Sequence, residues 1–218
     1  MCCRYYLGSS PELRPIYEAA ERSPLTERFT AHLNRPLVTE GEVRPTNLVP
    51  VIAPSKTGER SVFPMIWGFR LPNSRAPLVN ARVETAATKP SFAESWHQRR
   101  CIIPASYYYE WEHTVNPVTG KRRTGDKYQI RPAGSEVTWL AGLYRLEDFD
   151  GIRVPVFVVL TREPSNGIRF IHDRMPVILP GTAVDAWIAP GNEPETVLGQ
   201  SLTEMLFERA SGQQTIRF

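Results

Sequence analysis

Prolines are spread through the whole sequence rather than gathered in one stretch. The chain has 20 prolines in 218 residues, about 9% where roughly 5% is usual. Because a proline donates no backbone hydrogen bond and ends or kinks a helix, scattered prolines divide a chain into many short elements joined by turns. No internal repeat, low-complexity tract or change in composition marks a boundary. The sequence therefore predicts one domain, residues 1–218, built from short strands and helices.

The pattern of apolar residues predicts the class of fold. Segments rich in β-branched and aromatic residues, bounded by Gly, Pro, Asn or Asp, are typical of strands; they are Ser61–Trp67, Cys101–Ile103, Tyr107–Trp111, Lys127–Arg131, Val137–Tyr144 and Arg153–Leu160. Fewer segments look helical, namely one near Ser9 and Glu12, then Ser91–Arg100, Thr182–Ile188 and Glu195–Arg209 with an interruption near Gly199. Strands that dominate over peripheral helices predict an α+β class with a curved, barrel-like mixed sheet.

Charge alone does not identify a partner. Lys and Arg number 26 against 23 Asp and Glu, so the net charge is only +3, too slight to indicate nucleic acid. Local basic runs such as Arg99-Arg100 are interpreted as solvated surface. Hydrophobic residues at 41% and charged residues at 22% are typical of a folded soluble protein. The longest apolar stretch, Val154 to Leu160, is far short of the ~18 residues of a membrane helix, so no membrane partner is expected.

The cysteines and the start of the sequence indicate a compartment. Cys2, Cys3 and Cys101 are an odd number, which suits free thiols in a reducing environment better than a disulfide framework. The sequence begins Met-Cys-Cys-Arg-Tyr-Tyr and lacks the apolar segment of a secretory signal. We therefore expect a cytoplasmic monomer, nucleoid-associated if bacterial. No cofactor is expected, and a metal site ranks low because Cys-x-x-Cys spacing is missing.

Cys2 is the residue that most strongly indicates a type of chemistry. Methionine excision requires a small second residue, and Cys2 qualifies, so a processed chain can begin there. An α-amine has a pKa of ~7.7–8.0 against ~10.4 for lysine, so part of it is neutral and attacks aldehydes to form a Schiff base. The neighbouring thiol then closes a five-membered thiazolidine by intramolecular attack. On position alone, however, a residue in a frayed terminus is the favoured interpretation.

Two further segments carry groups suited to acid–base work. Asn80 follows the apolar run Pro77-Leu78-Val79, and Glu110 lies within the aromatic stretch 107–111. Strand alternation places Glu110 and Glu112 on one face and Trp111 on the other. A carboxyl among aromatic rings has a raised pKa and can serve as acid and base. An edge-strand carboxylate in water is an equally good interpretation without further context.

A third segment combines ionisable and apolar residues. His172, Asp173 and Arg174 are consecutive and lie between apolar neighbours, an expensive placement unless they line a pocket. His172 can shuttle protons, and Arg174 can hold a phosphate. A single histidine is more often structural, so His172 alone does not justify a catalytic role.

Short motifs recur in a fixed order along most of the chain. They are Met-Cys-x-Arg at the start, Pro45-Thr46, Trp67-Gly68, Asn80-Ala-Arg82-x-Glu84-Thr85, Lys89-Pro90-Ser91-Phe92, Arg100-Cys101-Ile-Ile-Pro104-Ala105, Tyr109-Glu110-Trp111, Leu140-Ala-Gly142-Leu143, Leu160-Thr161 and His172-Asp-Arg-Met-Pro-Val-Ile-Leu-Pro180. In this order they resemble the SRAP family, named for SOS response-associated peptidase. Members of that family shield abasic sites in single-stranded DNA.

The resemblance implies a role for each matched residue. Cys2 is then the nucleophile that joins the ring-opened aldehyde of an abasic deoxyribose, and Asn80, Glu110 and His172 are the other catalytic positions. By this resemblance Asn80 orients the N-terminal residue and the sugar, Glu110 transfers protons, and His172 helps to open the sugar. The DNA-binding positions that it implies are Arg4, Trp67, Arg82, Trp111, Thr161 and Arg174. The expected partner is single-stranded DNA containing abasic sites.

The sequence departs from the family pattern in two places. Cys3 stands where the family usually has glycine, and an extended N-terminal segment would point Cys3 away from Cys2. Glu42-Val43-Arg44 precedes Pro45, where the family usually shows an Asn-hydrophobic-Ala pattern. This second departure puts the contacts of that loop in question but not the nucleophile.

Other functions remain open at this stage. For the crosslinker, the resemblance also leaves open an abasic-site lyase activity and self-catalysed removal of Met1. The main alternative is an autoproteolytic or thiol peptidase in which Cys2 is the nucleophile and His172 the base. It needs only the thiol, whereas the crosslinker needs the free α-amine as well. A noncatalytic DNA-binding module is a further alternative, in which loss of the Cys2 thiol changes nothing.

Overall fold

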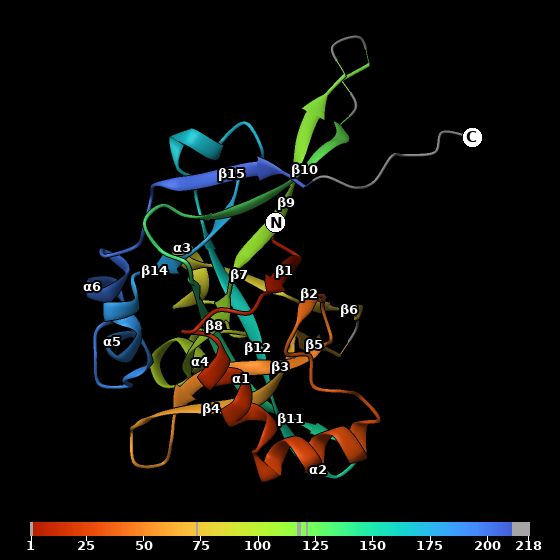
Figure 1. Cartoon of the computed structure of the whole chain (residues 1–218), viewed down its shortest axis with the longest axis vertical. Coiled ribbons are helices and arrows are strands. Elements are labelled where there is room, and N and C mark those ends of the chain that lie inside the picture. Colours follow the sequence, from red (N-terminus) through yellow and green to blue (C-terminus); the bar gives the residue numbers. More distant parts are fainter. Residues whose placement is uncertain (1, 73, 117–118, 121, 211–218) are drawn as a thin grey trace.

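The computed structural model describes residues 2–72, 74–116, 119–120 and 122–210 (Figure 1). Its helices are α1 Arg14–Glu21, α2 Pro24–Leu33, α3 Val83–Ala86, α4 Ala93–Gln98, α5 Val184–Ile188 and α6 Pro194–Leu198, with 3-10 turns η1 Asn166–Ile168 and η2 Gly181–Ala183. Its strands are β1 Arg4–Leu7, β2 Gly41–Val43, β3 Leu48–Pro54, β4 Arg60–Trp67, β5 Phe69–Leu71, β6 Ser74–Leu78, β7 Asn80–Arg82, β8 Arg100–Ala105, β9 Tyr107–Val115, β10 Arg122–Pro132, β11 Thr138–Phe149, β12 Ile152–Arg162, β13 Met175–Pro176, β14 Ile178–Leu179 and β15 Met205–Arg209.

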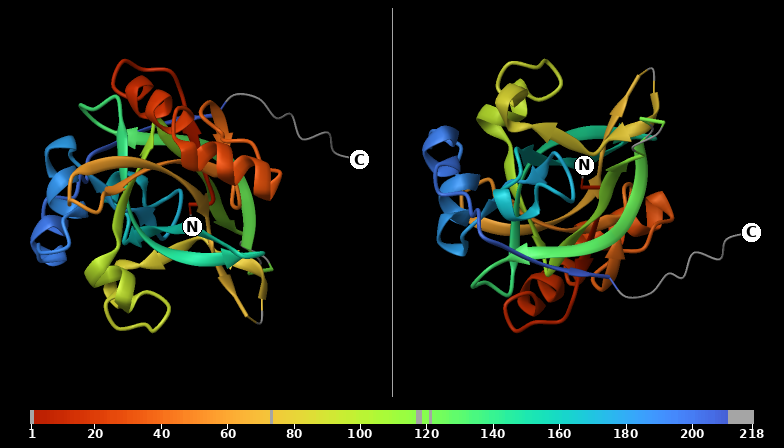
Figure 2. Two further views of the ribbon diagram at one scale, coloured as in Figure 1. Left: turned by 90° about the horizontal axis from the view of Figure 1, so that it is seen from below. Right: turned by 90° about the horizontal axis from the view of Figure 1, so that it is seen from above.

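Five strands close into a barrel. The order β12-β4-β3-β8-β11 returns to its start because β11 also pairs with β12, and the β12–β4 pair is parallel while the others are antiparallel. Figure 2 shows these strands curving around a common centre. Their side chains are buried almost without interruption, as along β8 and most of β12, because a closed barrel has no edge open to water. The predicted α+β class and barrel-like mixed sheet are confirmed.

A second sheet brings the start of the chain beside the barrel. Its order is β15-β10-β9-β1-β2, all antiparallel. Tyr5 of β1 pairs with Tyr108 of β9, and both rings are buried. The neighbours Arg4 and Tyr109, also paired, lie on the opposite face by the alternation of a strand. One face of this sheet therefore belongs to the interior and the other to the surface.

Arg100 lies in the interior, so the interpretation of this residue as solvated surface is wrong. Its side chain is 1% exposed and donates to the carbonyls of Trp96, Trp187 and Asn192 at 2.9, 2.6 and 3.0 Å. These carbonyls belong to the ends of α4 and α5 and the loop beyond. The guanidinium is buried because several backbone oxygens replace its water.

The expected helix Glu195–Arg209 is wrong over most of its length. Only α6 is helical there, and Met205–Arg209 forms β15, which pairs with β10 from Tyr128 to Pro132. Tertiary pairing with an available strand outweighs local helix propensity. The helix expected near Ser9 begins only at Arg14, so Pro15 falls in its first turn, where proline is tolerated. Helix α2, capped by the Ser23 side chain, was not predicted.

Candidate active site

Cys2 lies directly before β1 and is 1% exposed. Its Sγ donates to the carbonyl of Arg4 at 3.6 Å. Burial raises the pKa of the thiol well above its ordinary value, and the nearby charge of Glu110 raises it further. Cys3 is half-buried rather than enclosed, and its own charge adds a smaller upward contribution to the pKa of Cys2. The thiol that the sequence singles out is therefore a neutral group inside the protein.

Asn80 holds the backbone of Cys2 in place. It is the first residue of β7, which pairs in parallel with β12, so the barrel fixes its position. The Asn80 Nδ2 donates to the Cys2 carbonyl at 2.8 Å. The amide Oδ1 is buried and has no hydrogen-bond partner in the described part of the protein. An amide aimed at Cys2 with a spare acceptor is suited to hold a further donor.

Glu110 supplies a buried carboxyl group next to the thiol. It lies in β9 with only 3% of its surface exposed, and the backbone N–H of Trp111 donates to its Oε1 at 3.2 Å. Burial raises the pKa of this carboxyl above its ordinary value. A carboxyl whose pKa is moved toward neutrality can both give and take a proton.

His172 is buried beside the same strand. It is 7% exposed, its ring centroid lies 4.3 Å from that of His113, and the backbone N–H of His113 donates to the carbonyl of Ile171 at 3.0 Å. The Nδ1 accepts from the backbone N–H of Arg174 at 3.0 Å and lies 2.7 Å from a carboxylate oxygen of Asp173. One nitrogen cannot accept and donate at once, so the first contact suits the neutral tautomer with its hydrogen on Nε2, and the second suits a ring that carries a hydrogen on Nδ1.

The predicted DNA-binding residues fall into two groups. Arg4, Arg82 and Trp111 reach the surface, and the Arg4 guanidinium lies 5.6 Å from the centre of the Trp111 ring. Trp67 is buried in the barrel and donates to the carbonyl of Val79 at 2.9 Å. Thr161 is likewise buried. Their role in DNA binding stays a prediction, and for Trp67 and Thr161 it would act through the residues they support.

Arg174 is held between two partners. Its Nη atoms donate to both carboxylate oxygens of Glu84 at 2.8 Å, and Nη2 also donates to the carbonyl of Thr161 at 2.7 Å. The hydrogen bonds from Arg174 lower the pKa of the Glu84 carboxyl below its ordinary value. A phosphate contact by Arg174 therefore has to share its donors with Glu84.

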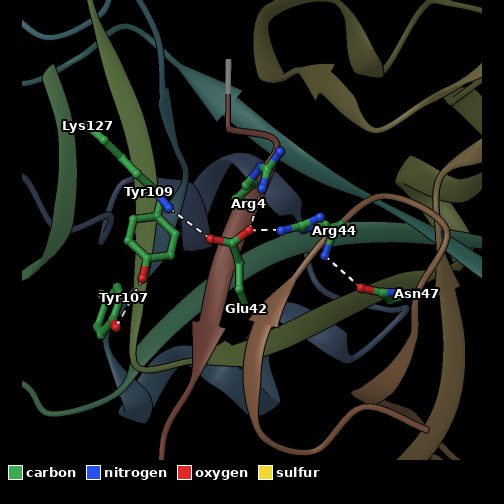
Figure 3. Close-up of polar contacts among 7 residues, drawn as sticks. All are labelled: Arg4, Glu42, Arg44, Asn47, Tyr107, Tyr109 and Lys127. Carbon is green, nitrogen blue, oxygen red and sulfur yellow. Dashed lines mark hydrogen bonds and ion pairs between the residues drawn. The ribbon is translucent and has the colours of Figure 1, made fainter. Parts of the chain in front are cut away.

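Sequence reasoning missed three residues of this region. Tyr5 and Tyr108 are buried, neither phenolic oxygen has a hydrogen-bond partner among the described residues, and burial, followed by the charge of Cys2, raises the pKa of both phenols. Strand alternation is the one sequence signal that indicates an inward position for these two tyrosines. The third is Glu42, which collects Arg4, Arg44 and Lys127 on the outer face (Figure 3). Its signal was the departure from the family pattern before Pro45.

Comparison with known proteins identifies the family of this chain. A family model described as SOS response associated peptidase (SRAP) matches residues 1–214. The chain belongs to the SRAP family. The predicted resemblance is confirmed, and the motifs that predicted it, from the start of the chain to Pro180, lie within the match.

Curated relatives of this SRAP protein match over part of its length. The abasic site processing protein YobE of Bacillus subtilis is 37% identical over 116 residues, covering 53% of this chain and 50% of the relative. The abasic site processing protein YedK of Escherichia coli is 32% identical over 130 residues, covering 57% and 54%. The matches thus span about half the length of these relatives.

Solved structures share the fold of this SRAP protein. A crystal structure of a protein from Bacteroides thetaiotaomicron has a TM-score of 0.70 at 22% identity, covering 95% of this chain and 91% of the other. A phage-related protein from Bordetella bronchiseptica has a TM-score of 0.67 at 19% identity, covering 97% and 95%. At these identities the likeness concerns the fold alone. In the described ranges, no helix has the length and apolar character needed to cross a membrane.

Proposed function

We propose that this protein captures abasic sites in single-stranded DNA through a covalent thiazolidine crosslink to Cys2. Two observations support this proposal. Relatives at 32–37% identity are named abasic site processing proteins, and Cys2 lies beside the Asn80 amide and the Glu110 carboxyl, while the His172 imidazole packs against His113 of the same strand as Glu110. The observation that carries the proposal is the 2.8 Å hydrogen bond from Asn80 to the Cys2 carbonyl, next to the buried Glu110.

The reaction needs both nucleophiles of an N-terminal cysteine. Met1, whose removal the proposal requires, lies outside the described residues. Once Met1 is removed, the α-amine of Cys2 attacks the C1′ aldehyde of the opened sugar, and the carbinolamine loses one water to form an imine. The imine is protonated on nitrogen, and the Cys2 sulfur adds to its carbon as the thiol proton is removed. A five-membered ring closes, and one water is released overall.

Glu110 is placed to move the protons of this sequence. The protonated carboxyl, which its raised pKa favours, donates to the leaving hydroxyl of the carbinolamine. The carboxylate that remains accepts the thiol proton of Cys2, whose own raised pKa keeps the thiol neutral until that moment. The ring nitrogen keeps the proton that it carried in the protonated imine, so Glu110 ends protonated, as it began. One acid–base group therefore serves both steps.

Other residues of the site hold the reactants. The unpartnered Oδ1 of Asn80 can accept from the liberated α-amine or from a sugar hydroxyl. His172 assists opening of the sugar, since an imidazole can remove the proton of the C1′ hydroxyl. Arg4, Arg82 and Arg174 contact phosphates, and the exposed edge of Trp111 contacts a neighbouring base.

Intact mass spectrometry tests this proposal directly. Wild-type protein is mixed with a single strand carrying one abasic site, and we expect a product with the summed mass of protein without Met1 and DNA, less one water. Cys2→Ala and a protein acetylated on the α-amine of Cys2 should form none, because each lacks one nucleophile. Glu110→Gln should slow the reaction by about a hundredfold or more.

The matched thiol control is Cys3→Ala, which should crosslink like the wild type. A crosslink that survives acetylation of the α-amine would rule out the Schiff-base route, and retention of Met1 in protein purified from cells would remove its nucleophile. The thiol-peptidase alternative is less well supported, because a peptidase needs a thiolate and burial raises the pKa of the Cys2 thiol.

A further inference from the structure

A single carboxylate accepts hydrogen bonds from three cationic side chains on the outer face of the second sheet (Figure 3). Glu42, the middle residue of β2, accepts from Arg4 of β1, from Arg44 Nε at 3.0 Å and from Lys127 Nζ of β10 at 2.8 Å. We call these four residues the Glu42 cluster. Lys127 and Arg4 come from strands on either side of β9, so the cluster bridges over that strand.

Aromatic rings of β9 lie directly beneath these cations. Lys127 Nζ lies 3.6 Å from the centre of the Tyr109 ring and 5.3 Å from that of Trp111. The Arg4 guanidinium lies over Trp111 as well. Farther along the same face, the rings of Tyr6 and Tyr107 stack with centroids 5.0 Å apart. Two cations of the cluster thus lie over aromatic rings of β9, with a further stacked pair of rings on the same face.

The charges of the Glu42 cluster do not cancel. Burial alone would raise the pKa of the Glu42 carboxyl, but hydrogen bonds from Lys127, Arg4 and Arg44 outweigh it and lower the pKa to about 2. Glu42 is therefore ionised at neutral pH, and three cations against one anion leave two positive charges. The side chain of Arg44 is 63% exposed, so its remaining donors face solvent.

We propose that the Glu42 cluster extends the phosphate contacts of Arg4, so that Arg44 and Lys127 hold further backbone phosphates of the DNA single strand outside the lesion pocket. A basic surface with interleaved aromatic rings is the combination that binds single strands without reading sequence. The inference rests on the proposed function in that the same strand occupies both places. Glu42 and Arg44 both lie where the sequence departs from the family pattern before Pro45, so the site belongs to this chain's own residues.

The salt dependence of noncovalent DNA binding tests whether the Glu42 cluster contacts phosphates. Binding of an undamaged 15-nucleotide single strand, which offers no aldehyde, is measured by fluorescence anisotropy across a series of salt concentrations. Each phosphate contact contributes about 0.7 to the slope of log Kd against log salt for a single strand. We expect Arg44→Gln and Lys127→Gln each to weaken binding and to lower that slope by about 0.7.

Arg22→Gln is the matched control. Arg22 is an exposed arginine paired with Glu18 at 2.7 Å, immediately after helix α1 and outside the second sheet, and its loss should leave the slope unchanged. Slopes of Arg44→Gln and Lys127→Gln equal to that of the wild type would overturn the inference, and so would failure of the wild type to bind an undamaged strand. Crosslinking to an abasic strand, measured separately, tests the proposed function alone.

Glu42→Gln separates a phosphate site from a purely structural ion network. Removing the carboxylate takes a negative charge away from the bound phosphates, so binding at low salt should tighten by about fivefold. The same substitution removes the anchor of three cations and should lower the melting temperature. Affinity and stability thus move in opposite directions if the cluster binds phosphate. Weaker binding together with lower stability would contradict the proposal.

Discussion

Glu42 shows how a single side chain links charge to stability. Its pKa is lowered to about 2 in the folded protein, below its ordinary value in an unfolded chain. A carboxyl with a lowered folded pKa contributes stability that is present above the unfolded pKa, near 4.5, and is lost as the pH falls toward 2. The cations Arg4, Arg44 and Lys127 are the cause.

We therefore predict that Glu42→Gln costs about 1 kcal/mol of unfolding free energy at pH 7, after allowance for solvent screening. The difference from the wild type should shrink between pH 4.5 and 2 as the native carboxyl is protonated. Urea unfolding across this pH range measures the difference in unfolding free energy. Glu40→Gln is the control, because Glu40 is an exposed carboxylate close by in the sequence. A difference that stays constant down to pH 2 would contradict the linkage.

Single residues of the candidate site were predictable to different degrees. Cys2, Glu110 and His172 were singled out by position, by an aromatic neighbourhood and by ionisable residues among apolar ones. The sequence could not indicate that Tyr5 and Tyr108 lie buried near the thiol, because strand pairing across more than 100 positions brings these residues together. Nor could it indicate that Trp67 is buried, because closure of the barrel decides that.

At the scale of elements, Gly142 marks the place where β11 bridges two strands. It pairs with Cys101 of β8 on one side and Val159 of β12 on the other. A Cβ there would lie 2.5 Å from Ile103 Cδ1, 2.7 Å from the Val158 carbonyl oxygen and 3.1 Å from the Cys101 sulfur. The barrel closes because this position has no side chain.

Gly142→Ala should therefore destabilise the protein by about 1–3 kcal/mol, the usual cost of overpacking a core. The measurement is chemical denaturation of the purified variant. Gly167→Ala is the control, since nothing lies within 4 Å of a Cβ built there and its φ is not positive. Equal stability of the two variants would show that the barrel accommodates the methyl group.

The strands were easier to predict than the rest. Strands β4 and β8 to β12 have β-branched and aromatic residues between clear turn residues, and the segments expected for them are confirmed. Strand β3 was missed because it contains Pro50 and Pro54 and is buried on both faces, so it shows no alternation. Helix α2 was missed although Ser23 and Pro24 are ordinary signals of a helix start.

At the scale of the whole molecule, Arg100 joins distant parts of the chain. From β8 it donates to carbonyls in α4, in α5 and in the loop after α5, which lie up to 92 positions away. We predict that Arg100→Leu costs at least about 3 kcal/mol, because several buried carbonyls lose their donor at once. Urea unfolding measures the loss.

Arg99→Leu is the neighbouring control. The Arg99 side chain pairs with Glu94 at 2.7 Å and is 30% exposed, and a partly exposed pair is worth about 0.5 kcal/mol. Similar losses for Arg99→Leu and Arg100→Leu would mean that the buried guanidinium does not hold the α4 and α5 regions to the barrel.

Closure of the barrel through β12 sets the order in which the protein can be completed during translation. Asn80 depends on β12, because β7 pairs with that strand, and β4 also takes β12 as its parallel partner. A nascent chain whose residues 152–162 have not yet left the ribosome therefore lacks β12. Without β12, nothing holds Asn80 in the position from which its amide donates to the Cys2 carbonyl. The position of Asn80 beside Cys2 is therefore completed only after β12 has been synthesised.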